Sequence, residues 1–92
     1  MIKINRKVLA ENIRYTDLVY ERINKKLNIN LTHLQIKKMI NNLILGTSIK
    51  DFHRKGKNIY IYNYSLNIGI TINFNSKTVI TANIINKQGK SE

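Results

Sequence analysis

The sequence predicts an α+β domain, with two to three N-terminal helices packed on one face of a three-stranded antiparallel sheet, or a four-stranded one if the N-terminus adds a strand. Up to Gly46 apolar residues recur at helical spacing, and from Ile59 onward they alternate with polar residues. At 92 residues the chain has room for one domain. We expect that domain over residues 1–86 and a flexible tail over residues 87–92.

The first part of the chain should form short elements. Residues 3–5 read as an edge strand or an extended lead-in, and residues 7–14 as a first short helix. Thr16 is a suitable N-cap for a second helix over residues 17–27, and Asp17 is favourably placed at its positive end. The core-facing side of that helix would carry Val19, Tyr20, Ile23 and Leu27.

The next helix has the strongest start signal in the chain. Thr32 and Gln35 have the spacing of a capping box, and Leu31 and Ile36 occupy the hydrophobic staple positions around it. We expect this helix to end at Gly46, which suits a left-handed C-terminal position. Its core face would carry Ile36, Met39, Ile40 and Leu43.

The second half of the chain should form strands. Residues 47–58 read as a polar connection, and residues 59–62 begin a period of two. Two longer alternating runs follow over residues 66–74 and 78–85, with hairpin loops expected at 63–65 and 75–77. The core should join the third helix to the middle strand through Ile68, Ile70 and Ile72.

The charge balance predicts an anionic partner. The chain carries 16 Lys and Arg against 5 Asp and Glu, a formal net charge of +11. A compact domain gains no stability from such an excess, whereas nucleic acid releases counterions when Lys and Arg replace them. An AT-rich genome would explain many lysines but not the shortage of acidic residues. We therefore expect a nucleic acid, RNA in preference to DNA, or a protein complex that handles nucleic acid.

Several classes of chemistry find no support in the composition. The absence of cysteine excludes disulfides, thiol nucleophiles and zinc–thiolate sites. Two histidines and few carboxylates make a metal unexpected, and four isolated glycines form no phosphate-binding loop, so we expect no cofactor. No apolar run approaches 18 residues and the N-terminus lacks the apolar region of a signal peptide, so we expect a cytoplasmic protein that avoids membranes.

A cationic segment followed by tyrosines is the candidate binding site. Residues 53–57 read His-Arg-Lys-Gly-Lys and lead into a strand whose outer face should show Tyr60 and Tyr62. Cations can hold phosphates while tyrosine rings stack bases, at about 1–3 kcal/mol each. The simpler interpretation is a solvated loop beside a half-exposed sheet that favours aromatics. The candidate binding residues are Lys50, Arg54, Lys55, Lys57, Tyr60 and Tyr62, together with Lys37 and Lys38 from the third helix.

The same segment could support metal-independent RNA cleavage. That reaction needs a base for the 2′-hydroxyl, an acid for the leaving oxygen and cations around the phosphorane. His53 would be the base or acid, since its ordinary pKa lies nearest neutrality, and Tyr60 would orient or donate. A single histidine in a loop is more often an ordinary surface residue.

Two resemblances accompany these patterns. The order of helices and β-meander, and the segment 78–82 (Thr-Val-Ile-Thr-Ala), resemble the RelE and barnase-like ribonuclease toxins, which implies endoribonuclease activity. Residues 15–27, together with 55–60, resemble a small uncharacterised family of low-GC Gram-positive bacteria and their mobile elements. That resemblance covers most of the chain and implies no activity.

Three alternatives remain open. A winged-helix DNA-binding protein would place His33, Gln35, Lys37 and Lys38 against DNA, with the strands as a wing. A phage or mobile-element inhibitor of a nucleic-acid-guided defence complex, of the anti-CRISPR type, would have no enzymatic activity. The exposed Tyr and Asn face could equally form a homodimer, because a small sheet with an edge strand invites pairing.

Overall fold

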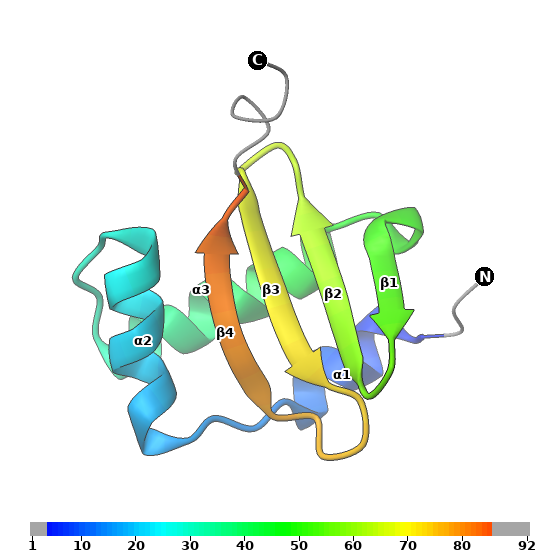
Figure 1. The fold of residues 1–92 in the computed structure, drawn as a ribbon, viewed down its shortest axis with the longest axis horizontal. Helices are drawn as coiled ribbons and strands as arrows, with labels where there is room; N and C mark the ends of the chain where they lie inside the picture. The colour runs from blue at the N-terminus through cyan, green and yellow to red at the C-terminus, as the bar shows by residue number, and fades with distance from the viewer. Residues whose placement is uncertain (1–3, 86–92) are drawn as a thin grey trace.

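The computed structural model describes residues 4–85 and has an α+β fold in which the helices precede the sheet, as the sequence predicts (Figure 1). The four strands form one antiparallel meander in the order β1-β2-β3-β4. The elements are α1 (Arg6–Asn12), α2 (Asp17–Leu27), α3 (His33–Gly46), the 3₁₀ turn η1 (Ile49–Asp51), β1 (Phe52–Lys55), β2 (Asn58–Asn63), β3 (Ile68–Asn73) and β4 (Val79–Ile84).

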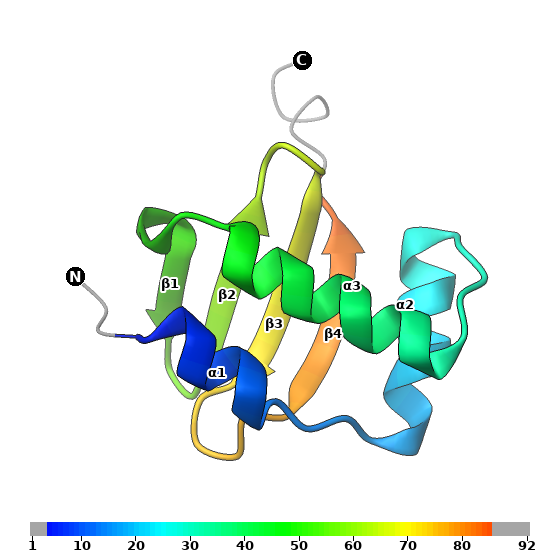
Figure 2. The same cartoon turned by 180° about the vertical axis from the view of Figure 1, so that it is seen from behind.

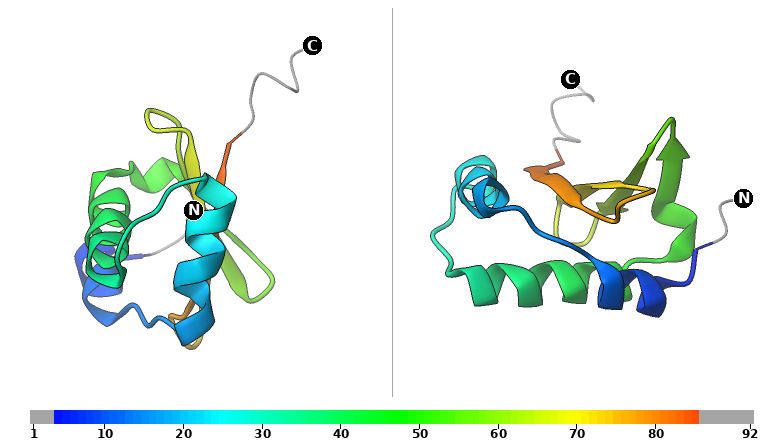
Figure 3. Two further views of the ribbon diagram at one scale, coloured as in Figure 1. Left: turned by 90° about the vertical axis from the view of Figure 1, so that its left-hand side faces the viewer. Right: turned by 90° about the horizontal axis from the view of Figure 1, so that it is seen from below.

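The helices occupy two positions around the sheet. α1 and α3 lie side by side on one face, and α3 runs across the strands (Figure 2). α2 lies along β4 at the edge of the sheet, where Arg22 Nη1 donates to the Ile80 carbonyl at 3.2 Å. Viewed end-on, no helix in residues 4–85 covers the second face of the sheet (Figure 3).

The core lies between α1, α3 and the sheet and extends under α2. Ile70 and Ile72 of β3 are 1% and 0% exposed, and they belong to the same cluster as the buried face of α3, which confirms the predicted helix-on-sheet core. The buried apolar residues are Leu9, Val19, Tyr20, Ile23, Leu27, Ile36, Ile40, Leu43, Ile44, Phe52, Ile59, Ile61, Ile70, Ile72, Val79 and Ala82.

Most helix ends follow the sequence signals. The capping box is present, with Thr32 Oγ1 accepting from Gln35 N and Gln35 Oε1 accepting from Thr32 N. Thr16 occupies the N-cap position of α2, but its side chain makes no capping hydrogen bond. The left-handed end predicted for Gly46 is wrong: α3 passes into extended backbone at Thr47, whose hydroxyl donates to the Leu43 carbonyl at 2.6 Å.

The fourth strand comes from a different segment than expected. Residues 4 and 5 form no strand, because the Asn5 side chain caps α1 by accepting from Val8 N, and residue 3 lies outside the described part. β1 instead forms within the segment expected to be a polar connection. Its single apolar residue, Phe52, pairs with Ile61 and is 2% exposed. One buried side chain in four leaves too weak an alternation to recognise in the sequence.

Two further features bear on the predictions. Arg14 forms an isolated parallel bridge with Thr78, so the α1–α2 connection lies against the start of β4. Within residues 4–85, none of the helices has the length and apolar character needed to span a bilayer. The tail predicted for residues 87–92 falls outside the described residues.

Candidate nucleic-acid interface

The uncovered face of the sheet carries small polar and aromatic side chains. Strand alternation directs the isoleucines of β2 and β3 toward the helices and their neighbours outward. The outward positions are His53 and Lys55 on β1, Asn58, Tyr60 and Tyr62 on β2, Gly69, Thr71 and Asn73 on β3, and Thr81 and Asn83 on β4. We call this set the open face.

The strand register aligns the two candidate catalytic residues. His53 lies directly opposite Tyr60, and Tyr60 lies opposite Thr71. Thr71 in turn faces Thr81, whose hydroxyl oxygen is buried without a hydrogen-bond partner. The Tyr60 hydroxyl accepts a 3.4 Å hydrogen bond from the Asn58 side chain. One row across the open face therefore combines an exposed imidazole, a phenol, the Thr71 hydroxyl and the buried Thr81 hydroxyl.

A group of rings lies next to this row. The Tyr62 ring is centred 5.7 Å from that of His53 and 6.1 Å from that of Tyr64. Opposite Tyr62 stands Gly69, where an added Cβ would lie 3.3 Å from Tyr62 Cδ1. The absence of a side chain at Gly69 thus allows the Tyr62 ring to lie close to β3.

Positive charge follows the β1 edge of the sheet. Lys55 projects from the open face, and Lys57 is exposed in the two-residue turn after β1, beside Gly56 with its left-handed φ of 64°. Lys50 is exposed in η1, immediately before the strand. The three lysines therefore bracket a short edge strand that lies next to the tyrosines of β2.

Other predicted binding residues lie elsewhere. Arg54 alternates to the helix side of β1, with Cζ 3.7 Å from the Phe74 ring centroid and Nε donating to the Gly56 carbonyl. Lys37 and Lys38 are exposed on α3, in the layer behind the sheet, and Lys37 Nζ lies 5.9 Å from the Tyr15 ring centroid. The structure therefore brings His53, Lys55, Tyr60 and Tyr62 together and separates Arg54, Lys37 and Lys38 from them.

The start of α3 is engaged in contacts within the chain. The His33 ring stacks on Tyr20 at 3.8 Å, and Tyr20 stacks on Tyr15 at 5.5 Å. Burial, with a smaller contribution from Tyr20, raises the pKa of Tyr15 far above its ordinary value of 10. Gln35 is held by the capping box. Three of the four side chains considered for contact with DNA, His33, Gln35 and Lys37, thus already make contacts within the chain.

Sequence reasoning missed several open-face positions. Thr71 and Thr81 complete the row from His53, yet they read only as the polar half of an alternating pattern. Arg22 reads as a solvent-facing helix residue, but it borders β4 through its bond to Ile80. Strand register shows the placement of the two threonines and a tertiary hydrogen bond that of Arg22, because the residues involved are distant in sequence. Among residues 4–85, no group of three or more His, Cys, Asp or Glu side chains could hold a metal ion.

Comparison with known proteins gives one match. The model of a family described as a protein of unknown function, DUF3781, matches residues 8–83, from within α1 to near the end of β4. Both segments that resemble a small uncharacterised family, 15–27 and 55–60, fall inside these residues. No curated protein and no solved structure matches the chain. Because the match covers most of the sequence, the chain belongs to the DUF3781 family.

Proposed function

We propose that this protein binds single-stranded nucleic acid, RNA in preference to DNA, on the open face of its sheet. The observation that supports this most is the pairing of β1 with β2, which sets exposed lysines beside a strand that displays Tyr60 and Tyr62. Aromatic side chains on an exposed sheet face stack unpaired bases in a common mode of RNA recognition. A duplex hides its bases from such a surface.

Each strand has a distinct part in this proposal. The phosphates would follow β1, held by Lys55 and by the lysines at its ends, Lys50 and Lys57. The bases would lie over β2, whose rings are half-buried and fixed by their neighbours. The Thr71 hydroxyl lies beyond them on β3, where it would meet base edges or a 2′-hydroxyl.

Fluorescence anisotropy with a labelled single-stranded oligonucleotide tests the proposal. Titrations at several salt concentrations should show the logarithm of the binding constant falling with the logarithm of the salt concentration. The expected slope is about −2, from roughly 0.7 for each of three neutralised phosphates. The same sequence as DNA, and as an RNA duplex, should bind more weakly. Absence of binding at low salt, or equal affinity for duplex and single strand, would discard the open face as a nucleic-acid site.

A second candidate function, metal-independent RNA cleavage, draws support from the His53–Tyr60 pair. Directly opposite residues of an antiparallel pair have Cβ atoms about 5 Å apart, a spacing that can place an acid and a base on either side of one phosphate. Lys55 adds a cation on the same face. Two predictions from the sequence agree with such a cytoplasmic toxin. They are the resemblance to RelE and barnase-like toxins and an origin in low-GC Gram-positive bacteria or their mobile elements.

Labelled RNA incubated with the pure protein and excess EDTA separates the two candidates. For a nuclease, His53→Ala should abolish cleavage and leave RNA binding nearly unchanged, because proton transfer contributes mainly at the transition state. Lys55→Ala should weaken both, since a cation near the phosphorane also holds the bound phosphate. If the RNA stays intact at micromolar wild-type protein, cleavage is excluded and nucleic-acid binding remains as the proposed function.

A further inference from the structure

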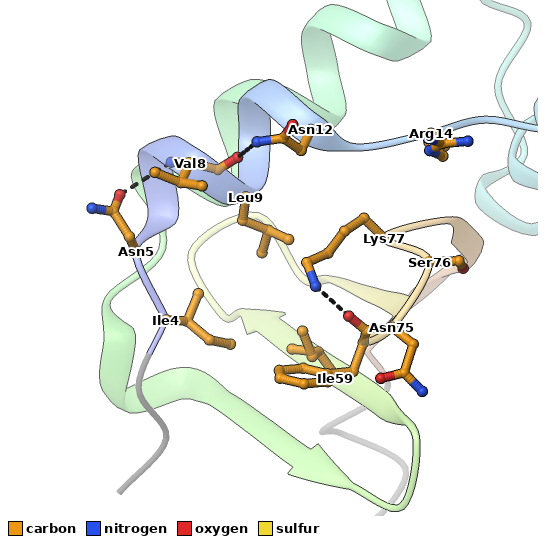
Figure 4. Close-up of a pocket in the computed structure, with 11 residues that line it drawn as sticks. Ile4, Asn5, Val8, Leu9, Asn12, Arg14, Ile59, Asn75, Ser76 and Lys77 are labelled. Atoms are coloured by element: carbon orange, nitrogen blue, oxygen red, sulfur yellow. Dashed lines mark hydrogen bonds between the residues drawn. The ribbon is translucent and has the colours of Figure 1, made fainter.

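A cleft lies on the helix side of the molecule, between α1 and the loop that joins β3 to β4 (Figure 4). Its volume is about 470 Å³, within the usual range of about 300–1,000 Å³ for small-molecule sites. β2 contributes Ile59, the neighbour in sequence of Tyr60, and the two side chains point to opposite faces of the sheet. The cleft is therefore separate from the open face.

The walls of the cleft are apolar. Leu9 of α1 and Ile59 of β2 are 3% and 1% exposed, and Figure 4 shows both with Ile4 around the space between helix and loop. Phe74 also lines the cleft and is half-buried. Val8 is 52% exposed at the border. A ligand that filled this space would remove apolar surface of both partners from water.

Positive charge and amides surround these walls. Lys77 and Arg14 both line the cleft, and none of its eleven lining residues is Asp or Glu. The Lys77 ammonium bonds to the Phe74 carbonyl and lies 4.7 Å from the Phe74 ring centroid. An ammonium has three donors, so this bond leaves donors for a further acceptor.

The backbone conformation at Lys77 is one that lysine rarely adopts. Lys77 has a left-handed φ of 61°, which Asn or Gly adopts more readily than Lys. Asn73 Oδ1 orders the loop by accepting from the backbone N–H groups of Asn75 and Ser76. Lysine is thus not the residue that this backbone favours, and besides its bond to the Phe74 carbonyl its side chain adds a cation beside the cleft.

From this combination we infer that the cleft binds a small amphiphilic anion, an acyl or aryl group that carries one carboxylate. The apolar body would lie against Leu9, Ile59 and Phe74, and the carboxylate would meet Lys77, with Arg14 adding positive potential. Charge complementarity selects this class: a neutral ligand would forgo the cation, and a cationic ligand would be repelled by it. The inference does not depend on nucleic-acid binding.

Three ligands with one apolar body test the assignment by ¹H–¹⁵N NMR on the full chain: 4-phenylbutyrate, 4-phenylbutan-1-ol and 4-phenylbutylamine. The carboxylate should shift amides of α1 and of residues 74–78 and leave the open face unchanged. The carboxylate should bind about 5-fold more tightly than the alcohol, which corresponds to one partly exposed charge contact. The amine should bind weakest of the three.

Variants test the role of the cation. Lys77→Asn, which tolerates the left-handed backbone, should remove the preference for carboxylate over alcohol, whereas the matched control Lys50→Asn should keep it. Val8→Glu, at an exposed position that needs no repacking, should weaken the carboxylate more than the amine. Shifts outside the cleft, equal binding of alcohol and carboxylate, or an unchanged preference in Lys77→Asn would each overturn the assignment. RNA affinity should be the same for wild type and Lys77→Asn, so failure here is distinguishable from failure of the open face.

Discussion

Tyr62→Ala should weaken single-stranded RNA binding by about 5- to 150-fold. The Tyr62 ring lies on the open face close to β3, where Gly69 leaves room for it, and we assign one stacked base to this side chain. Loss of one stacked base costs about 1–3 kcal/mol, which converts to that range of dissociation constants. The ring is half-buried on the uncovered face, so its removal leaves the isoleucine core intact.

Fluorescence anisotropy with a labelled oligonucleotide measures the effect at one fixed salt concentration, and thermal unfolding by circular dichroism confirms that each variant is folded. Tyr62→Phe is the matched control, because it keeps the ring and removes only the hydroxyl, and it should bind within about two-fold of wild type. Wild-type affinity in folded Tyr62→Ala would refute base stacking. Equal weakening in both variants would assign the contact to the hydroxyl instead.

Three further predictions concern charge, packing and pH. Lys57→Ala should reduce the salt slope of RNA binding by about 0.7, measured by anisotropy, whereas Lys38→Ala on the helix layer should leave it unchanged. Ile70→Ala should lower the free energy of unfolding by about 2–5 kcal/mol in urea, since Ile70 is 1% exposed, and a loss below about 0.5 kcal/mol would contradict its place in the core. Burial raises the pKa of Tyr15, so the contribution of its neutral phenol to folding stability is complete below pH 10 and is lost as the pH rises further. Tyr15→Phe should therefore flatten the alkaline loss of stability in thermal melts at a series of pH values. An identical decline in the variant would assign that loss to other groups.

The fold was predictable where a local signal and burial agreed. The capping box at Thr32 and the alternation around Ile70 each specify an element without tertiary information, and both elements form. β1 was not predictable, because only Phe52 among its four residues is buried. Gly46 misled for the opposite reason: glycine permits a left-handed end, but Thr47 continues in extended backbone and bonds to α3 through its hydroxyl.

The candidate site was predictable as a segment but not as a surface. Charge and aromatic residues between Lys50 and Tyr62 marked the region, yet a contiguous run cannot show which residues share a face. As a loop, residues 53–57 would offer all their cations together; as a strand, they divide, with Lys55 on the open face and Arg54 over Phe74. The partners Thr71 and Thr81 lie outside this segment and enter only through strand register.

Edge protection offers a simpler reason for the lysines of β1, and the open face must be weighed against it. Lysines on an edge strand hinder pairing with other chains, and tyrosines are favoured on any half-buried sheet. Edge protection requires charge anywhere along β1 and does not depend on which side chains the neighbouring strand carries. Base stacking instead requires rings on β2 beside the exposed side chains of β1, as Tyr60 lies opposite His53, and an approach to β3 that Gly69 keeps open. Loss of a lysine should promote self-association under the first account and reduce the salt slope under the second. The two accounts therefore differ in a measurable way even though they invoke the same residues.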